Sequence, residues 1–169
     1  LPRFVTVSNI ESKDPNAVVK GNERVIAPRL SDAAFFFSQD KKSDLESMLP
    51  RLDQVIFQSD LGTYKQKVER ISNLAGLIAG RLGANVEAAT RAGMLCKSDL
   101  VTDMVNEFPD LQGLMGGYYA QHAGETNDVS EAIADHYLPI QSGGNLPRTV
   151  VGCCVSIADK LDTLTGLFG

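Results

Sequence analysis

The stretch AGMLCKSDLVTD, residues 92–103, is the part of this sequence that decides the fold. Its apolar start indicates a buried helix, and that helix ends in Cys96 and Lys97. Near the C-terminus a second apolar stretch, VVGCCVSIA, leads in the same way into Asp159. A buried charge without a partner costs several kcal/mol. We therefore predict that the two helices face each other and that Lys97 forms an ion pair with Asp159.

Regular spacing of apolar residues predicts further helices on both sides of this stretch. Between Leu61 and Leu82 the apolar residues recur at the i, i+3, i+4, i+7 positions of an amphipathic helix, and Gly83 then ends it. Asn85 can cap the next helix, and Pro147 suits the first turn of the last one. The predicted helices cover residues 61–82, 86–97, 98–108, 110–124, 127–137 and 147–168, with shorter ones at 31–37 and 44–49. The predicted fold class is all-α, a bundle of about six or seven helices joined by short loops.

Two runs of residues indicate close packing. Gly116 and Gly117 lie inside a predicted helix, where each glycine costs about 1 kcal/mol relative to alanine. Close approach of another helix is the favoured explanation, and close approach of a ligand is the alternative. The run Phe35-Phe36-Phe37 cannot direct all three rings at one core, so at least one side is expected to pack on a neighbouring segment or domain.

The first thirty residues differ from the rest. Residues 3–10, RFVTVSNI, are β-branched and aromatic and predict a short strand, which we assign to a preceding domain. Residues 17–30 have a weak helical period interrupted by Gly21 and Pro28, and they are interpreted as a solvated connecting segment or, alternatively, as a small phosphate-contacting face. We therefore divide the chain into residues 1–30, the end of a preceding domain with a linker, and residues 31–169, a helical domain cut short at its C-terminal end.

The composition of the chain limits the classes of function that it can have. The chain has 169 residues, 43% hydrophobic and 22% charged, which indicates one soluble globular domain. Its net charge of −5 argues against a nucleic-acid-binding surface over the whole domain, although a local basic patch is compatible with it. No apolar run is long enough to predict a membrane span. Cys96, Cys153 and Cys154 are odd in number and lie in apolar helical patterns, so we predict free buried thiols and a cytoplasmic location.

The spacing motifs of common catalytic and metal sites are missing from the sequence. There is no CxxC, HxxxH, P-loop or GxGxxG pattern. The histidines, His122 and His136, are near predicted helix ends and are interpreted as surface residues. Cys96 would act as a nucleophile only with a base nearby and a lowered pKa. Asp159 and Asp162 share one helix face, and the residues alone leave open whether they are surface carboxylates or part of a buried site.

The helix that ends in a two-residue polar motif, together with a last helix carrying ADKLDT, resembles the HD superfamily of metal-dependent phosphohydrolases. That all-α family holds divalent metal with a histidine, a His-Asp doublet and a final aspartate. The resemblance places these ligands on Tyr64, on Cys96 and Lys97, and on Asp159, so only the last ligand survives. Tyrosine and lysine are poor ligands for hard cations. The resemblance therefore implies a degenerate site with no metal and no catalytic residue.

A second resemblance covers essentially the whole chain. The sequence is similar to the family of β subunits of the bacterial two-subunit glycine–tRNA ligase, in which this region is the HD-like domain and the end of the domain before it. It implies an α2β2 enzyme whose α subunit uses ATP and magnesium at the active site, while the β subunit mainly recognises tRNA. The segments that carry it are LPRFVTVSNIESKDP (1–15), GNERVIAPRLSDAAFFF (21–37), RLDQVIFQSDLGTYKQKVERI (51–71), TRAGMLCKSDLVTDMVNEFPDLQGLMGGYYA (90–120) and ADKLDTLTGLFG (158–169).

This resemblance implies that the fragment carries no aminoacylation residue and no cofactor of its own. Its expected partners are the α subunit, tRNA and the rest of the β subunit, with no membrane partner. Cations that could neutralise tRNA phosphates are Lys20, Arg24, Arg29, Lys65, Lys67, Arg70 and Arg91. Two alternatives stand beside a tRNA-binding scaffold: a purely structural domain, and a working metal-dependent phosphohydrolase of the HD type.

Overall fold

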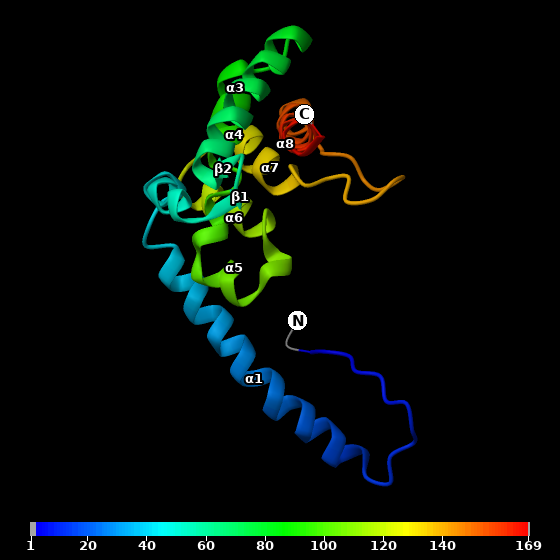
Figure 1. The fold of residues 1–169 in the computed structure, drawn as a ribbon. Helices are drawn as coiled ribbons and strands as arrows, with labels where there is room; N and C mark the ends of the chain where they lie inside the picture. The colour runs from blue at the N-terminus through cyan, green and yellow to red at the C-terminus, as the bar shows by residue number, and fades with distance from the viewer. Residues whose placement is uncertain (1–2, 169) are drawn as a thin grey trace. The chain divides into compact units, whose positions relative to one another are not determined.

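The N-terminal part of the chain consists of an extended segment followed by one long helix. The computed structural model describes residues 3–168, and the chain divides into two compact units between Phe36 and Phe37. Helix α1 runs from Pro15 to Asp40 without a break (Figure 1). The predicted strand over residues 3–10 is wrong, because this segment pairs with no other strand among the described residues. Its β-branched residues are exposed instead of contributing to a ladder.

The predicted interruption of the helical period at Gly21 and Pro28 is also wrong, since α1 passes through both residues. The role of residues 17–30 as a connecting segment stays a prediction. A proline inside a helix removes one backbone hydrogen bond and costs about 3 kcal/mol. A stripe of partly buried residues three, four or seven positions apart favours the helix nonetheless, and it consists of Val18, Asn22, Ile26, Ala33 and Phe36. Ser31, expected to cap a separate helix, lies in the middle of α1.

The second unit is a helical bundle, which confirms the all-α fold class. Helices α3 (Tyr64–Leu82), α4 (Val86–Leu95) and α8 (Val150–Phe168) pack against one another. Helix α7 (Asn127–Asp135) lies against α8, α4 and α6 (Leu114–His122) and closes the core (Figure 1). Short elements complete it: α2 (Leu45–Met48), η1 (Leu49–Gln54), β1 (Ile56–Gln58), β2 (Gly62–Thr63), η2 (Ser98–Val101), α5 (Asp103–Glu107) and η3 (Pro109–Leu111). Strands β1 and β2 pair antiparallel.

Side-chain caps account for most helix boundaries. Thr63 and Gln66 form a reciprocal capping box at the start of α3, and Gly83 ends that helix with a left-handed φ of 66°. Asn85 caps α4 as predicted. The helix predicted over residues 98–108 is broken instead, because Thr102 caps α5 within it. Pro147 precedes α8, whose first turn is capped by the Thr149 hydroxyl accepting the Gly152 N–H.

The two glycines of α6 lie where α6 packs closely on α7. A Cβ atom on Gly117 would lie 2.8 Å from Ala134 Cβ and 3.0 Å from the Ser130 carbonyl oxygen, both on α7. A Cβ on Gly116 would meet Ile133 and the Asp99 carboxylate. Close packing of another helix is therefore confirmed at this point. In the phenylalanine run, Phe37 is half-buried and stacks on Tyr119, which confirms packing for one of the three rings.

Candidate functional site

Helices α3, α4 and α8 meet at a buried cluster of charged side chains. Lys97, just after the end of α4, places its Nζ 2.8 Å from Asp159 Oδ2 on α8. Both side chains are buried, with 3% of Lys97 and 10% of Asp159 exposed. The predicted ion pair is confirmed. Lys97 follows the end of α4, whereas Asp159 lies in the middle of α8 after its apolar first half, and each buried charge is neutralised by the other.

Lys67 on α3 joins the same cluster from the other side. Its Nζ lies 3.1 Å from Asp159 Oδ1 and 3.0 Å from Asp162 Oδ2. It also donates a hydrogen bond to the Thr163 hydroxyl at 2.7 Å. The two oxygens of Asp159 therefore each face an ammonium group, one from Lys97 and one from Lys67.

Arg70, one turn further along α3, completes the cluster at its exposed edge. Its Nε lies 2.5 Å from Asp162 Oδ1, and its Nη2 lies 3.2 Å from Asp162 Oδ2. The planar guanidinium thus grips the carboxylate with two donors. Three cations surround two carboxylates, so the net charge of this cluster is positive.

The carboxylates of the cluster are ionised. Burial alone would raise the pKa of Asp159, but the Lys97 ammonium, together with weaker contributions from His136 and Lys67, holds it below its ordinary value. For Asp162 burial acts in the same upward direction, and hydrogen bonds from Arg70 and Lys67 outweigh it and lower the pKa. Asp159 and Asp162 are therefore ionised at neutral pH, and each is paired with basic side chains.

Aromatic rings enclose the two lysines. Lys97 Nζ lies 3.8 Å from the centre of the Tyr137 ring, and Lys67 Nζ lies 4.3 Å from that of Phe57. These are cation–π distances. Tyr64 packs edge-on against Phe57 and is half-buried, and burial raises the pKa of its hydroxyl. Tyr64 thus lies beside the cluster as an aromatic wall and not as an ionised ligand.

Cys96 lies next to Lys97 but takes no part in the cluster. Its Sγ is 3.3 Å from the Gly93 carbonyl oxygen and is fully buried. Burial raises the pKa of this thiol to about 12, so it stays protonated at neutral pH. A protonated, inaccessible thiol is neither a nucleophile nor a metal ligand. The other two cysteines are free as predicted, with Cys154 buried and Cys153 half-buried.

The donor set does not fit a divalent metal ion. A metal would have to displace at least one ammonium from Asp159, the only carboxylate at the four positions of the HD pattern. Among residues 3–168, no three His, Cys, Asp or Glu side chains lie together in a way that could hold a metal. Tyr64, Cys96 and Lys97 offer a neutral phenol, a neutral thiol and a cation, none of which suits a hard cation.

Two buried residues near the cluster were missed by the sequence reasoning. His136 was interpreted as a surface residue, which is wrong: it is fully buried, its Nδ1 lies 2.6 Å from the Ile133 carbonyl, and its Nε2 has no partner. Asp99 Oδ2 accepts the backbone N–H groups of Gly113 and Gly116 at 2.6 and 3.0 Å and so anchors the start of α6. In both cases an apolar residue lies three positions earlier in the sequence, and this spacing could have predicted that the side chain is buried.

The cations that we predicted to contact tRNA differ in their burial and in their ion pairs. Lys67 is buried in the cluster, so its charge is not presented to solvent. Arg70 pairs with Asp162, and Arg91 pairs with Glu125 and Glu46. Lys65 is half-buried on α3, whereas the three on α1 are exposed: Lys20, Arg24 and Arg29.

The exposed cations of α1 do not share one face. Lys20 and Arg24 are four residues apart and lie on the same side of the helix. Arg29 follows five residues later and lies about 140° round the helix axis from Arg24. Lys20 and Arg24 therefore form the basic face of α1.

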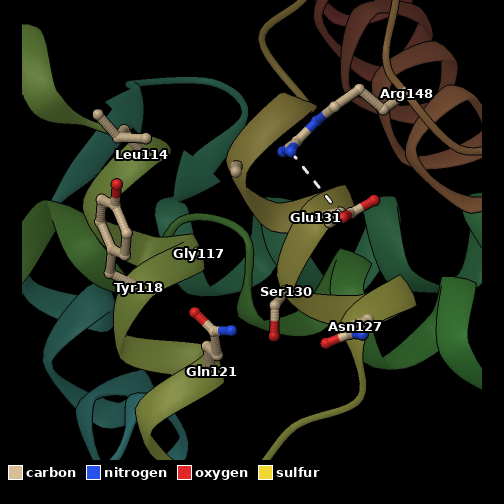
Figure 2. A pocket seen from close by; sticks show the side chains of 9 residues that line it. Leu114, Gly117, Tyr118, Gln121, Asn127, Ser130, Glu131 and Arg148 are labelled. Carbon is tan, nitrogen blue, oxygen red and sulfur yellow. Dashed lines mark ion pairs between the residues drawn. The ribbon is translucent and has the colours of Figure 1, made fainter.

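A pocket of about 240 Å³ lies between α6 and α7. Figure 2 shows Tyr118 and Gln121 of α6 on one side of it and Asn127 and Ser130 of α7 on the other. Its cation, Arg148, is already held by Asp135 at 2.8 Å and by Glu131 at 3.9 Å. The pocket is therefore polar without a free positive charge.

Comparison with known proteins identifies the family. A family model described as glycyl-tRNA synthetase beta subunit matches residues 1–169. The chain is 57% identical to the glycine–tRNA ligase beta subunit of Stutzerimonas stutzeri and 55% identical to that of Pseudomonas aeruginosa, over all 169 residues in both cases. It spans about a quarter of the length of these relatives, 25% in each. By this match along its whole length, the chain belongs to the glycyl-tRNA synthetase beta-subunit family.

Proposed function

We propose that this chain is a non-catalytic, HD-like section of the β subunit of a glycine–tRNA ligase, and that it serves as a scaffold and as a contact surface for tRNA. The whole enzyme would join glycine to its tRNA with ATP in the cytoplasm, as an assembly of two α and two β subunits. ATP and magnesium would be used by the α subunit. The observation that carries the proposal is that two ammonium groups lie within ion-pair distance of Asp159: Lys97 Nζ is hydrogen-bonded to Oδ2 at 2.8 Å, and Lys67 Nζ lies 3.1 Å from Oδ1.

That arrangement argues against the alternative, a phosphohydrolase of the HD type. Such an enzyme needs a metal to generate a nucleophile from water and to polarise the phosphoryl oxygen. Here the remaining carboxylate of the HD pattern is neutralised by two lysines, and the buried thiol of Cys96 is protonated. No side chain of the cluster is left to activate water.

The same contacts support a scaffold role. The cluster ties α3, α4 and α8 together through side chains from three distant parts of the chain. Lys67 lies between Asp159 and Asp162, where it would replace the positive charge that a metal ion contributes between carboxylates, and Lys97 adds a second positive charge beside Asp159. The fold can therefore keep the helix arrangement of a metal site without the metal.

The tRNA contact is supported by the exposed cations and restricted by the overall charge. The chain carries a net charge of −5, so a phosphate-binding surface must be local. The basic face of α1, Lys20 and Arg24, is exposed and four residues apart. It is the part of the predicted cation set that the structure leaves available in one place.

The test compares the two-subunit enzyme with its separate subunits in two assays. Hydrolysis of phosphomonoesters and phosphodiesters is measured with added manganese, magnesium or cobalt, and tRNA affinity is measured by fluorescence anisotropy. We expect no hydrolysis attributable to the β subunit, and tRNA affinity that depends on it. Metal-dependent turnover abolished by Asp159→Asn would instead establish the phosphohydrolase, and tRNA affinity equal with and without the β subunit would overturn the tRNA contact.

A further inference from the structure

A second cation-lined hollow lies where α1 and α6 both end. It has a volume of about 270 Å³, and its lining includes Lys41, Lys42, Ser43 and His122. Lys41 and Lys42 follow directly after α1, and His122 is the last residue of α6. None of these residues belongs to the charge cluster or to the cations considered above.

The backbone beneath the two lysines is fixed in place. Asp40, the residue before Lys41, is buried and accepts a hydrogen bond from the Tyr119 hydroxyl at 2.8 Å. Its two oxygens also accept the backbone N–H groups of Asp103 and Met104, each at 3.0 Å. The last turn of α1 is thereby attached to α5 and α6. Lys41 and Lys42 thus extend from an anchored backbone and not from a loose loop.

The charge in this hollow is not neutralised within the described chain. Lys41 Nζ lies 5.1 Å from the Phe37 ring centre, and Lys42 Nζ donates to the amide oxygen of Gln39 at 2.6 Å. Neither ammonium forms one of the ion pairs that hold Lys67, Lys97, Arg70, Arg91 and Arg148. The one carboxylate of the lining, Asp44, accepts the Ser47 N–H at 2.7 Å as the cap of α2. The lining of the hollow therefore contains two ammonium groups and one carboxylate.

The size and the donors of the hollow indicate its ligand. Its volume of about 270 Å³ is below the roughly 300–1,000 Å³ of pockets for drug-sized molecules. Two ammonium groups, a hydroxyl and an imidazole suit a compact anion with several acceptor oxygens, such as a phosphate group. The α6–α7 pocket, whose arginine is already paired, offers no comparable charge.

We propose that this hollow, defined by Lys41, Lys42, Ser43 and His122, binds a backbone phosphate of tRNA. The assignment of the phosphate to RNA rests on the proposed function. Lys41 and Lys42 neutralise the phosphate, and Ser43 and His122 donate hydrogen bonds to its oxygens. Because a phosphate contact carries no sequence information, the hollow positions the tRNA on the subunit without selecting bases.

The test uses the two-subunit enzyme with Lys41→Gln and Lys42→Gln combined, and measures tRNA affinity over a series of salt concentrations. Each neutralised phosphate contributes close to one unit to the slope of log affinity against log salt. We expect the variant to bind tRNA more weakly at low salt and to lower the magnitude of the slope by about 1. The matched control combines Arg51→Gln and Arg81→Gln, which removes the same charge from exposed positions outside the hollow.

The outcomes separate the possible explanations. A slope that is unchanged in the Lys41/Lys42 variant, or reduced equally in the control, overturns the inference. Inorganic phosphate provides the second arm: phosphorus NMR that detects a phosphate site lost in the variant, while tRNA binding is unaffected, assigns the hollow to free phosphate and overturns the RNA assignment. If tRNA affinity in the parent enzyme does not depend on the β subunit at all, the proposed function fails as well.

Discussion

At the residue scale, Lys97 and Asp159 form a buried charged pair at two positions where the HD resemblance would place metal ligands. Charged residues of this kind, buried where apolar helices pack together, must be neutralised locally because desolvation is costly. The fold meets that requirement with two lysines and one shared aspartate. We therefore expect the contributions of Lys97 and Asp159 to the free energy of unfolding to depend strongly on each other.

The coupling can be measured with a double-mutant cycle. Lys97→Ala leaves Asp159 buried with only Lys67 as a partner, and we expect it to lower the free energy of unfolding by about 3 kcal/mol. In a cycle of Lys97→Met and Asp159→Asn, the double variant should lose less than the sum of the single variants, because it leaves neither charge unpaired. Urea unfolding measures all four proteins. Losses that add to within about 0.5 kcal/mol would show that the two residues do not interact.

His136 and Asp99 give the chain a pH dependence with two opposing contributions. Burial, and secondarily the Lys97 charge, lowers the pKa of His136 to about 3. The unfolded chain therefore binds the extra proton below pH ~6.5, and stability falls as pH decreases from there. Burial raises the pKa of Asp99 to about 6. The folded chain binds that proton first, so this group adds stability as pH falls from about 6 to 4.

Replacing either residue should leave the pH dependence of stability that the other residue causes. In Asp99→Asn, the loss of stability between pH 6.5 and about 4 should become steeper, approaching the 1.4 kcal/mol per pH unit of one proton. In His136→Gln, the slope should reverse, and acidification from about pH 6 should stabilise the protein. The readout is the slope of unfolding free energy against pH, which is independent of any constant loss from the substitution. Parallel slopes for both variants and the parent would contradict this assignment.

At the element scale, the helices of the bundle could be predicted from the sequence, and α1 could not. Helix α3 combines an amphipathic pattern, a capping box and a terminal glycine that agree with one another. In α1, Gly21 and Pro28 pointed to a break. Local propensity at these two residues predicted a break in the helix, but a weak stripe of partly buried residues favours a continuous one.

The candidate site was predictable to a similar extent. The pairing of Lys97 with Asp159 follows from two apolar stretches that each end in a charge. Lys67 follows the same logic, because it lies four residues before the buried Ile71, but its positive charge suggested a surface role. The anchoring of α6 by Asp99 depends on backbone N–H groups 14 and 17 residues away, and no sequence spacing reveals such a contact.

The basic face of α1 should act on tRNA through charge alone. Lys20→Glu combined with Arg24→Glu, in the two-subunit enzyme, should weaken tRNA binding at low salt and reduce its salt dependence, because the two side chains share one face. Arg51→Glu with Lys13→Glu changes the charge equally at exposed positions outside α1, and serves as the control. Equal effects of both double variants would indicate general repulsion and not a contact at this face.

At the scale of the whole molecule, the chain is acidic overall but contains local groups of positively charged side chains. The net charge is −5, yet the interior cluster is cationic and the hollow beside α6 has two unneutralised lysines. Interior cations hold the helices together, whereas the tRNA contact proposed above uses cations at the surface, Lys20 and Arg24 among them.

The proposed degenerate HD site predicts that restoring the doublet of the HD pattern yields no catalysis. Cys96→His with Lys97→Asp supplies two donors, but Tyr64 still occupies the first ligand position and Lys67 still faces Asp159. The added carboxylate would also lie beside Asp159 without the ammonium that neutralised it. We expect the variant to bind no stoichiometric manganese or magnesium, to hydrolyse no phosphoester, and to unfold at a lower temperature than the parent. Metal analysis, a phosphoesterase assay and a thermal melt check these three results. One metal per chain, with a raised melting temperature in its presence, would show that the helix frame alone still specifies a metal site and that Lys67 yields to it.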